Sequence, residues 1–182
     1  MRRIFRIVVL VLLAVNCFAF PAHASGGRSH AVTLTMLPDE TFYAAVSSGI
    51  RRAKKEIRGC FYLFKATGSR GNLPRTLVDD LIAASRRGVD VVIELERDGP
   101  GNGSVYEQNR QTASLLSEGG VRVRFDGAKT TTHVKALVVD GRYVYLGSHN
   151  LTQSALKFNN ELSVMVDSRE FAEQVTTYLD NL

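Results

Sequence analysis

Two alternating apolar runs joined by Asp140-Gly141 make up the stretch HVKALVVDGRYVYLGSHN, residues 133–150. An Asp-Gly pair between such runs is a strong signal for a two-residue hairpin turn. In the register set by that turn, Ser148 lies directly opposite His133. The stretch therefore predicts a β-hairpin, provided that no bulge intervenes, because a bulge would move the second strand's side chains to the other face.

Several polar groups would converge on this hairpin. Alternation along the first strand puts His133 and Lys135 on one face, and directly opposed residues have Cβ atoms about 4.5 to 5.5 Å apart, which brings Ser148 within reach. The Asn150 amide follows two residues after Ser148. An ammonium and neutral donors suit a phosphodiester, whose nonbridging oxygens must be held as their charge redistributes. We therefore expect Lys135, Ser148 and Asn150 to bind phosphate and His133, with an ordinary pKa near about 6.5, to attack it.

A carboxylate is needed to hold the other ring nitrogen of that histidine, and we assign this role to Glu161. It opens the alternating segment 161–167, which predicts a strand. Asp140 is expected to have a structural role because of its place in the turn. His149 is expected to point away from Ser148, in a structural or solvent-exposed position.

The same residues resemble the HKD motif of the phospholipase D superfamily, in the form found in its short, single-motif bacterial endonucleases. The similarity extends from about residue 32 to the C-terminus. The matching positions are His133, Lys135, Asp140, Gly147, Ser148 and Asn150.

The resemblance implies a role for each residue of the site. His133 would form a phosphohistidine intermediate, Lys135 and Asn150 would bind the phosphate, Ser148 would supply a supporting hydroxyl, and Glu161 would orient the histidine. No metal or other cofactor is implied. The function expected is a metal-independent phosphodiesterase, most directly a broad-specificity endonuclease on DNA or RNA. A phospholipase D-type lipid phosphodiesterase is the alternative, and a noncatalytic nucleic-acid-binding protein would have no need of a nucleophile.

The chain holds one copy of the motif, whereas the resemblance implies a second histidine that protonates the leaving oxygen. No other histidine has a lysine two residues later. A closed twofold interface brings the same residue together twice. We therefore predict an obligate homodimer with the active site at the twofold axis and nucleic acid as the substrate partner.

The N-terminus has the layout of a secretory signal peptide. Three arginines precede an apolar run at 7–20, and Ala22-His23-Ala24 supplies a small-residue cleavage pattern. The run is shorter than the roughly 20 residues of a membrane span. We expect residues 1–24 to be cleaved, leaving a periplasmic or secreted bacterial protein without a stable membrane anchor. An uncleaved anchor and lipidation at Cys17 are the alternatives.

Cleavage would lower the net charge from 23 − 18 = +5 to 20 − 18 = +2, because residues 1–24 contain three arginines and no acids. Attraction to nucleic acid must then be local or created by dimerisation. The basic run at 51–55, on a predicted helix, is either a solvated face or a nucleic-acid track. Cys60, the one cysteine of residues 25–182, is expected to be buried, with an intersubunit disulfide as the alternative.

The order of predicted elements indicates an α/β sandwich, in which a mixed β-sheet is flanked by helices. Residues 25–182 have the length of one domain per chain, and the resemblance implies the same phospholipase D-like fold. Predicted strands cover 31–36, 60–65, 89–96, 121–125, the hairpin and 161–167. Predicted helices cover 40–57, 74–87, 106–117, a short segment near Ser154, and 169–178.

Overall fold

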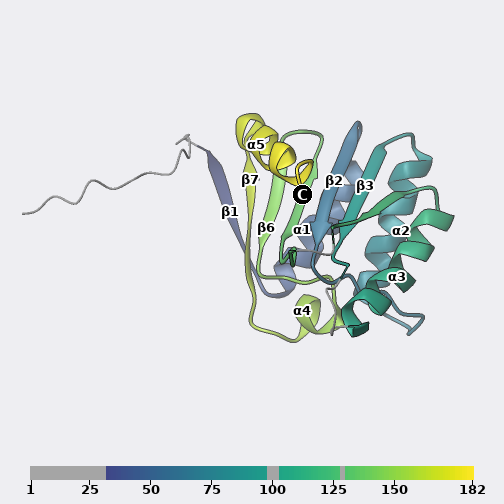
Figure 1. The fold of residues 1–182 in the computed structure, drawn as a ribbon. Coiled ribbons are helices and arrows are strands. Elements are labelled where there is room, and N and C mark those ends of the chain that lie inside the picture. Colours follow the sequence, from purple (N-terminus) through teal and green to yellow (C-terminus); the bar gives the residue numbers. More distant parts are fainter. Residues whose placement is uncertain (1–31, 98–102, 128–129) are drawn as a thin grey trace, which may run out of the picture.

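A seven-stranded sheet forms the centre of the protein (Figure 1). The computed structural model describes residues 32–97, 103–127 and 130–182, so the predicted signal peptide lies outside the described residues. The strands are β1 (Thr33–Pro38), β2 (Glu56–Phe61), β3 (Asp90–Leu95), β4 (Arg122–Phe125), β5 (Lys135–Val139), β6 (Tyr143–Gly147) and β7 (Leu162–Asp167). The helices are α1 (Glu40–Arg52), α2 (Leu73–Arg86), α3 (Gly103–Glu118), α4 (Gln153–Lys157) and α5 (Arg169–Leu179).

The sheet is mixed, as predicted. Its strand order is β1-β7-β6-β5-β2-β3-β4. Strands β2, β3 and β4 run parallel, and every other neighbouring pair is antiparallel. Helices α2 and α3 connect the parallel strands, whereas a short turn joins the antiparallel pair β5 and β6, as is usual for these two kinds of pairing.

Helices cover both faces of the sheet. Figure 1 shows α5 in front of the strands and α1 behind them. The larger core packs α1 to α4 against one face, with Phe42, Ile50, Leu77, Leu81, Leu116 and Leu156 fully buried. The smaller core packs α5 against the other face, with Val138, Val144, Val166 and Ala172 buried. Within the described ranges, none of the helices has the length and apolar character needed to cross a bilayer.

The hairpin turn forms where it was predicted, but the register beyond it differs. Arg142 N donates to Val139 O (3.1 Å). The φ angles of Asp140 and Gly141 are 55° and 59°, the left-handed conformation that a tight hairpin turn requires. Val139 nevertheless pairs with Tyr143, so Arg142 is one extra residue and forms a bulge.

The bulge overturns the predicted pairing of Ser148 with His133. One extra residue shifts every later position of β6 by one, and the last pair of the ladder is Ala136 with Leu146. Strand β5 also begins at Lys135 rather than at His133. His133 and Ser148 therefore reach the same end of the sheet from the segments beyond the two strands, not as a cross-strand pair.

Helix α1 is shorter than predicted because the residues after Arg52 form hydrogen bonds with the β5–β6 turn instead of continuing the helix. The Asp140 carboxylate accepts hydrogen bonds from three consecutive N–H groups, those of Lys54 (3.0 Å), Lys55 (2.7 Å) and Glu56 (3.2 Å). These bonds hold the chain in a turn after Arg52 and start β2 at Glu56, earlier than the predicted 60–65. The predicted structural role of Asp140 is confirmed.

Candidate active site

The predicted site residues gather at the end of the sheet where β2 and β6 end and where β5 and β7 begin. Tyr62 N donates to Val134 O (2.9 Å), which holds the segment before β5 against the continuation of β2. Leu151 N donates to Leu63 O (2.9 Å), so the segment after β6 also lies against the continuation of β2. Helix α4 follows directly and lies at this end of the molecule (Figure 1).

Lys135 carries its positive charge in a nearly buried position, with only 8% of the residue exposed. Its Nζ donates to the backbone oxygen of His133 (2.9 Å) and lies 5.2 Å from the centre of the Tyr62 ring. Burial lowers the pKa of Lys135, while attraction to Glu161 opposes the shift. An ammonium so little hydrated interacts strongly with an anion that enters the site.

His133 is exposed beside this charge. Its ring centre lies 4.5 Å from that of Tyr62, with 57° between the ring planes. Partial desolvation of the ring and the neighbouring Lys135 ammonium lower the pKa of His133. The imidazole is therefore neutral at pH 7 and has a free nitrogen lone pair, which a nucleophile requires. It borders a cavity of about 600 Å³.

Ser148 and Glu161 form a hydrogen-bonded pair. The Ser148 hydroxyl contacts the Glu161 carboxylate and also accepts a bond from Leu162 N (3.0 Å). Asn159 Nδ2 donates to the other Glu161 oxygen (3.0 Å). Within one described chain Glu161 thus engages Ser148, and the expected hydrogen bond to His133 is not formed. The reason is that the segment after β6 runs beside the start of β7, where Ser148 N donates to Leu162 O (3.2 Å).

Asn150 has unused hydrogen-bonding capacity. Its side-chain oxygen is buried and has no hydrogen-bond partner among the described residues. Buried polar atoms without a partner are uncommon in folded proteins. Asn150 lies two residues after Ser148, and its unpaired amide oxygen could accept a hydrogen bond from a ligand or from a protonated group.

His149 has a structural role, which was one of the two positions expected for it, and is not exposed to solvent. It is fully buried and stacks on Phe42 with ring centres 4.3 Å apart. Its Nδ1 lies 2.7 Å from Ser163 Oγ, and its Nε2 lies 3.0 Å from Asp39 O. Burial lowers the pKa of His149, so the ring is neutral and joins the segment after β6 to β7 and to the start of α1.

Asp39 is a positioning residue that the sequence did not reveal. Its carboxylate accepts a bond from Glu161 N (2.9 Å), and its own N donates to Glu161 O (3.0 Å). Its φ of 48° is unusual for a residue other than glycine. An Asp before a helical segment indicates an N-cap, yet this side chain makes no cap hydrogen bond and holds Glu161 instead. Tyr62 was also missed, because no local pattern connects it with His133.

Cys60 is a free, fully buried thiol, as expected. Burial is the main reason that its pKa rises to about 12, so it remains protonated and unreactive at neutral pH. Within the described part of the chain, no group of three or more His, Cys, Asp or Glu side chains is placed to hold a metal ion.

Comparisons with known proteins agree with this site and fold. A family profile described as "Cardiolipin synthase, PLD-like domain" matches residues 46–182. Phospholipase D of Rickettsia felis is 34% identical over 101 residues, which are 56% of this chain and 46% of that protein. Cardiolipin synthase A of Serratia proteamaculans is 25% identical over 144 residues, which are 79% of this chain and 28% of that protein. The chain thus spans less than half the length of these curated relatives.

Two solved structures match most of the chain. Nuc of Salmonella typhimurium, a phospholipase D family member, superposes with a TM-score of 0.68 at 26% identity, covering 83% of this chain and 93% of Nuc. NucT of Helicobacter pylori has the same fold, with a TM-score of 0.68 at 19% identity and coverage of 83% and 95%. The family profile, the mixed sheet and the HKD residues together place this chain in the phospholipase D superfamily.

Proposed function

We propose that this protein is a metal-independent phosphodiesterase, and that it is an endonuclease that cleaves DNA or RNA through a phosphohistidine at His133. The observation that carries the proposal is the pairing of an exposed, neutral imidazole with the nearly buried Lys135 ammonium. The first supplies a nucleophile, and the second stabilises a phosphodiester anion as charge builds on its oxygens.

The reaction has two steps. A ring nitrogen of His133 attacks phosphorus, the P–O bond to the departing nucleoside oxygen breaks, and a second histidine gives that oxygen a proton. Water then attacks the phosphohistidine, loses a proton to the second histidine, and the P–N bond breaks. Lys135 holds the nonbridging oxygens in both steps, while Ser148, fixed by Glu161, and Asn150 supply hydrogen bonds.

The second histidine is proposed to be His133 of another copy, in an obligate homodimer with the site at its twofold axis. The exposed position of His133 at one end of the sheet supports this arrangement. So do two large apolar side chains near Glu161, Phe158 with 71% and Leu162 with 52% of the residue exposed. Burying such side chains against a second copy would contribute to association.

Nucleic acid is favoured over lipid because the match to Nuc covers 93% of that chain, whereas the matches to the Rickettsia phospholipase D and the Serratia cardiolipin synthase cover only 46% and 28% of those proteins. A phospholipase D-type lipid phosphodiesterase is the second candidate. The family profile and the name of the Rickettsia relative favour it. In that case Phe158 and Leu162 would contact the bilayer instead of a second copy.

The test is cleavage of supercoiled plasmid and of RNA by the purified protein in excess EDTA, beside His133→Ala and His133→Asn. We expect the wild type to cut and both variants to be inactive, because Asn keeps approximately the size of His but lacks its nucleophilic ring. A phosphohistidine trapped by acid quench in the wild type alone would identify the intermediate.

Other outcomes would change the assignment. Cleavage that needs added metal would contradict the mechanism, and near-wild-type activity of His133→Asn would remove His133 as the nucleophile. Turnover of phosphatidylglycerol vesicles without any cutting of nucleic acid would favour the lipid phosphodiesterase.

We also propose export to the periplasm or beyond, on the pattern of residues 1–24. N-terminal sequencing of protein recovered from a periplasmic fraction is expected to begin at Ser25. Recovery of the intact N-terminus with the membranes would support an uncleaved anchor.

A further inference from the structure

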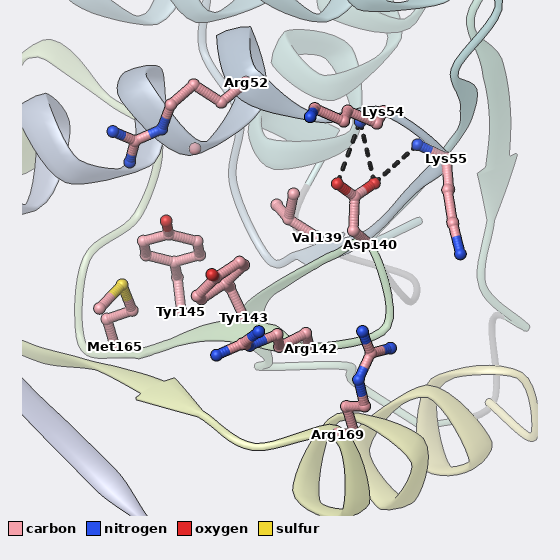
Figure 2. A pocket seen from close by; sticks show the side chains of 11 residues that line it. Arg52, Lys54, Lys55, Val139, Asp140, Arg142, Tyr143, Tyr145, Met165 and Arg169 are labelled. Carbon is pink, nitrogen blue, oxygen red and sulfur yellow. Dashed lines mark hydrogen bonds between the residues drawn. The ribbon is translucent and has the colours of Figure 1, made fainter.

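A second cavity lies at the other end of the sheet, and the site described above does not use it. It encloses about 630 Å³ between the end of α1, the β5–β6 turn and the start of α5 (Figure 2). Lys135 begins β5 and Asp140 follows its last residue, so at about 3.4 Å per residue the turn side of the cavity is roughly 17 Å from Lys135. Tyr145 and Met165 line the nearer side, level with Leu137, and none of the proposed catalytic residues lines the cavity.

The cavity concentrates positive charge. Five of its lining residues are cationic and one is acidic, Asp140, which gives 5 − 1 = +4. Residues 25–182 carry 20 − 18 = +2 in total, so the rest of that segment carries 2 − 4 = −2. The five cations are Arg52, Lys54, Lys55, Arg142 and Arg169. A concave surface with this charge attracts anions much more strongly than the protein as a whole.

Most of these cations form no close ion pair, although Arg169 lies near enough to Asp167 to help lower the pKa of that carboxyl. Arg142 is paired with Asp167, through contacts of 2.5 and 2.9 Å. The other four form no ion pair with any carboxylate in the described ranges. The carboxylate of Asp140 points at backbone N–H groups, as Figure 2 shows, and not at the ends of the lysine side chains.

A tyrosine also lines this cavity. Tyr145 is only 2% exposed as a residue and borders the cavity together with the cations. Figure 2 shows it directed toward the side that carries Arg52. Burial raises the pKa of Tyr145, so the hydroxyl keeps its proton. Gly49 leaves the room for it, because a Cβ there would lie 2.4 Å from the Tyr145 oxygen.

Guanidinium groups, ammonium groups and a neutral hydroxyl donor together match the oxygens of a phosphate group. We propose that this cavity binds a backbone phosphate of the nucleic-acid strand whose reacting phosphodiester lies at His133, an inference that rests on the proposed nuclease function. The distance of roughly 17 Å between Lys135 and the turn side of the cavity corresponds to about five nucleotide steps of a duplex at 3.4 Å each. The cavity would thus anchor long substrates without taking part in the reaction.

A membrane surface fits this cavity less well. Insertion into a bilayer needs exposed apolar side chains beside the cations. The exposed large apolar residues of the described chain lie elsewhere, and none lines the cavity: Val32, Leu34, Met36, Phe158, Leu162, Tyr178 and Leu182.

The test removes one charge at a time and compares long with small substrates. Arg52→Gln, Arg169→Gln and the double variant are measured beside Arg124→Gln, an exposed arginine on the edge strand β4 with no place in the cavity. Binding of a 20-base-pair duplex is followed against salt concentration in a His133→Ala background, which prevents cleavage. We expect the slope of log K against log salt to fall by about one per cavity arginine and to stay unchanged in Arg124→Gln.

Kinetics separate anchoring from chemistry. With intact His133, the cavity variants are expected to raise KM for plasmid DNA at unchanged kcat and to leave turnover of a small chromogenic phosphodiester untouched. Tyr145→Phe should also raise KM for plasmid DNA, because it removes only the hydroxyl.

The outcomes distinguish this inference from the proposed function. If the wild type cuts plasmid and the cavity variants match it in salt slope and KM, the cavity proposal fails and the nuclease proposal stands. If the variants lose binding to phosphatidylglycerol vesicles but keep wild-type DNA binding, the cavity serves a lipid surface and the proposal is wrong. If the wild type neither binds nor cuts nucleic acid, both proposals fail.

Discussion

At the scale of single residues, the site depends on a lysine kept almost out of water. The Lys135 ammonium is directed to the backbone oxygen of His133 and the face of Tyr62, neither of which neutralises its charge. Its full charge therefore acts on the imidazole of His133 and on any phosphate nearby. Because the Lys135 ammonium causes both effects, its removal should change the pKa of His133 and the rate of catalysis together.

The pH dependence of kcat/KM tests this coupling. The attacking imidazole must be neutral and its pKa is lowered, so the acid limb of the profile should lie below pH 6.5, the ordinary pKa of histidine. Loss of the proton from the second His133, the general acid, should set the alkaline limb. In Lys135→Met the repulsion is gone, so the acid limb should move up toward 6.5 while kcat/KM falls by about 10² to 10³. The measurement uses a small phosphodiester between pH 4.5 and 8, with the exposed Lys157→Met as control. An acid limb that stays in place in Lys135→Met would contradict the assignment.

Asp140 belongs to the motif but acts on stability. Asp140→Ala leaves three backbone N–H groups without their acceptor and puts alanine at a φ of 55°. We expect a loss of about 1 to 3 kcal/mol in the free energy of unfolding by urea. Asp140→Asn, which tolerates this backbone conformation and keeps one oxygen acceptor, should lose less. Both variants should retain the wild-type kcat well below their melting temperatures, and a severe loss of kcat in the folded Asn variant would give Asp140 a catalytic role.

At the scale of elements, the site depends on how closely the end of β6 approaches the start of β7. A Cβ on Gly147 would lie 2.4 Å from the Cα of Ser163 and 2.6 Å from the backbone oxygen of Leu162. Backbone atoms cannot move away independently, so only glycine permits this approach. The approach brings Ser148 to Glu161, since Ser148 directly follows β6 and Glu161 directly precedes β7.

Gly147→Ala should therefore damage the site through the backbone. We expect β6 and β7 to be forced apart, with a fall in kcat/KM and a lower free energy of unfolding. Gly68→Ala is the matched control, because a Cβ there meets nothing within 4 Å. Equal behaviour of the two variants in activity and in urea unfolding would show that the close approach is not needed.

His149 links three elements and makes their packing sensitive to pH. Its pKa in the folded protein lies below the ordinary 6.5, so the unfolded chain takes up a proton first as the pH falls. Its contribution to stability is complete above about pH 6.5 and is lost as the pH falls toward the folded pKa. His149→Gln cannot gain this proton, so its unfolding free energy should depend less on pH between 7 and 5. Urea unfolding at several pH values measures the difference, and parallel curves for the two proteins would refute this role.

At the scale of the whole molecule, the proposed mechanism lets the single chain supply only half of the acid and nucleophile pair. The proposed second half is another copy, met at the end of the sheet where Phe158 and Leu162 are exposed. The cationic cavity lies at the opposite end and would stay open in such a dimer. Two copies would then present one composite active site with an anion-binding cavity on either side.

Leu162→Asp should separate the copies, because a buried carboxylate without a partner destabilises an interface. We expect a monomeric mass by sedimentation at micromolar concentration and loss of activity. Leu34→Asp is the control, since Leu34 is similarly exposed (53%) but lies toward the other end of β1. A fully active monomer, in either variant or in the wild type, would disprove the shared site.

The sequence by itself determined the order of elements, the mixed sheet, the hairpin turn and the set of motif residues. These features follow from local rules, namely apolar periodicity, turn chemistry at Asp140-Gly141 and the choice of polar side chains. The predicted element ends were wrong where a distant group intervened. Helix α1 stops at Arg52 because Asp140, 84 to 86 residues away from its partners, holds the next turn.

Only the tertiary structure decided how the site is assembled. A single bulge at Arg142 replaced the predicted pairing of Ser148 with His133, and the choice between bulged and regular turns depends on the strands on either side. The partner of Glu161 is Ser148 because of the approach of β6 to β7, and Asp39 holds Glu161 from 122 residues away. Such contacts arise from packing between segments distant in the chain, and the local sequence of either segment does not contain them.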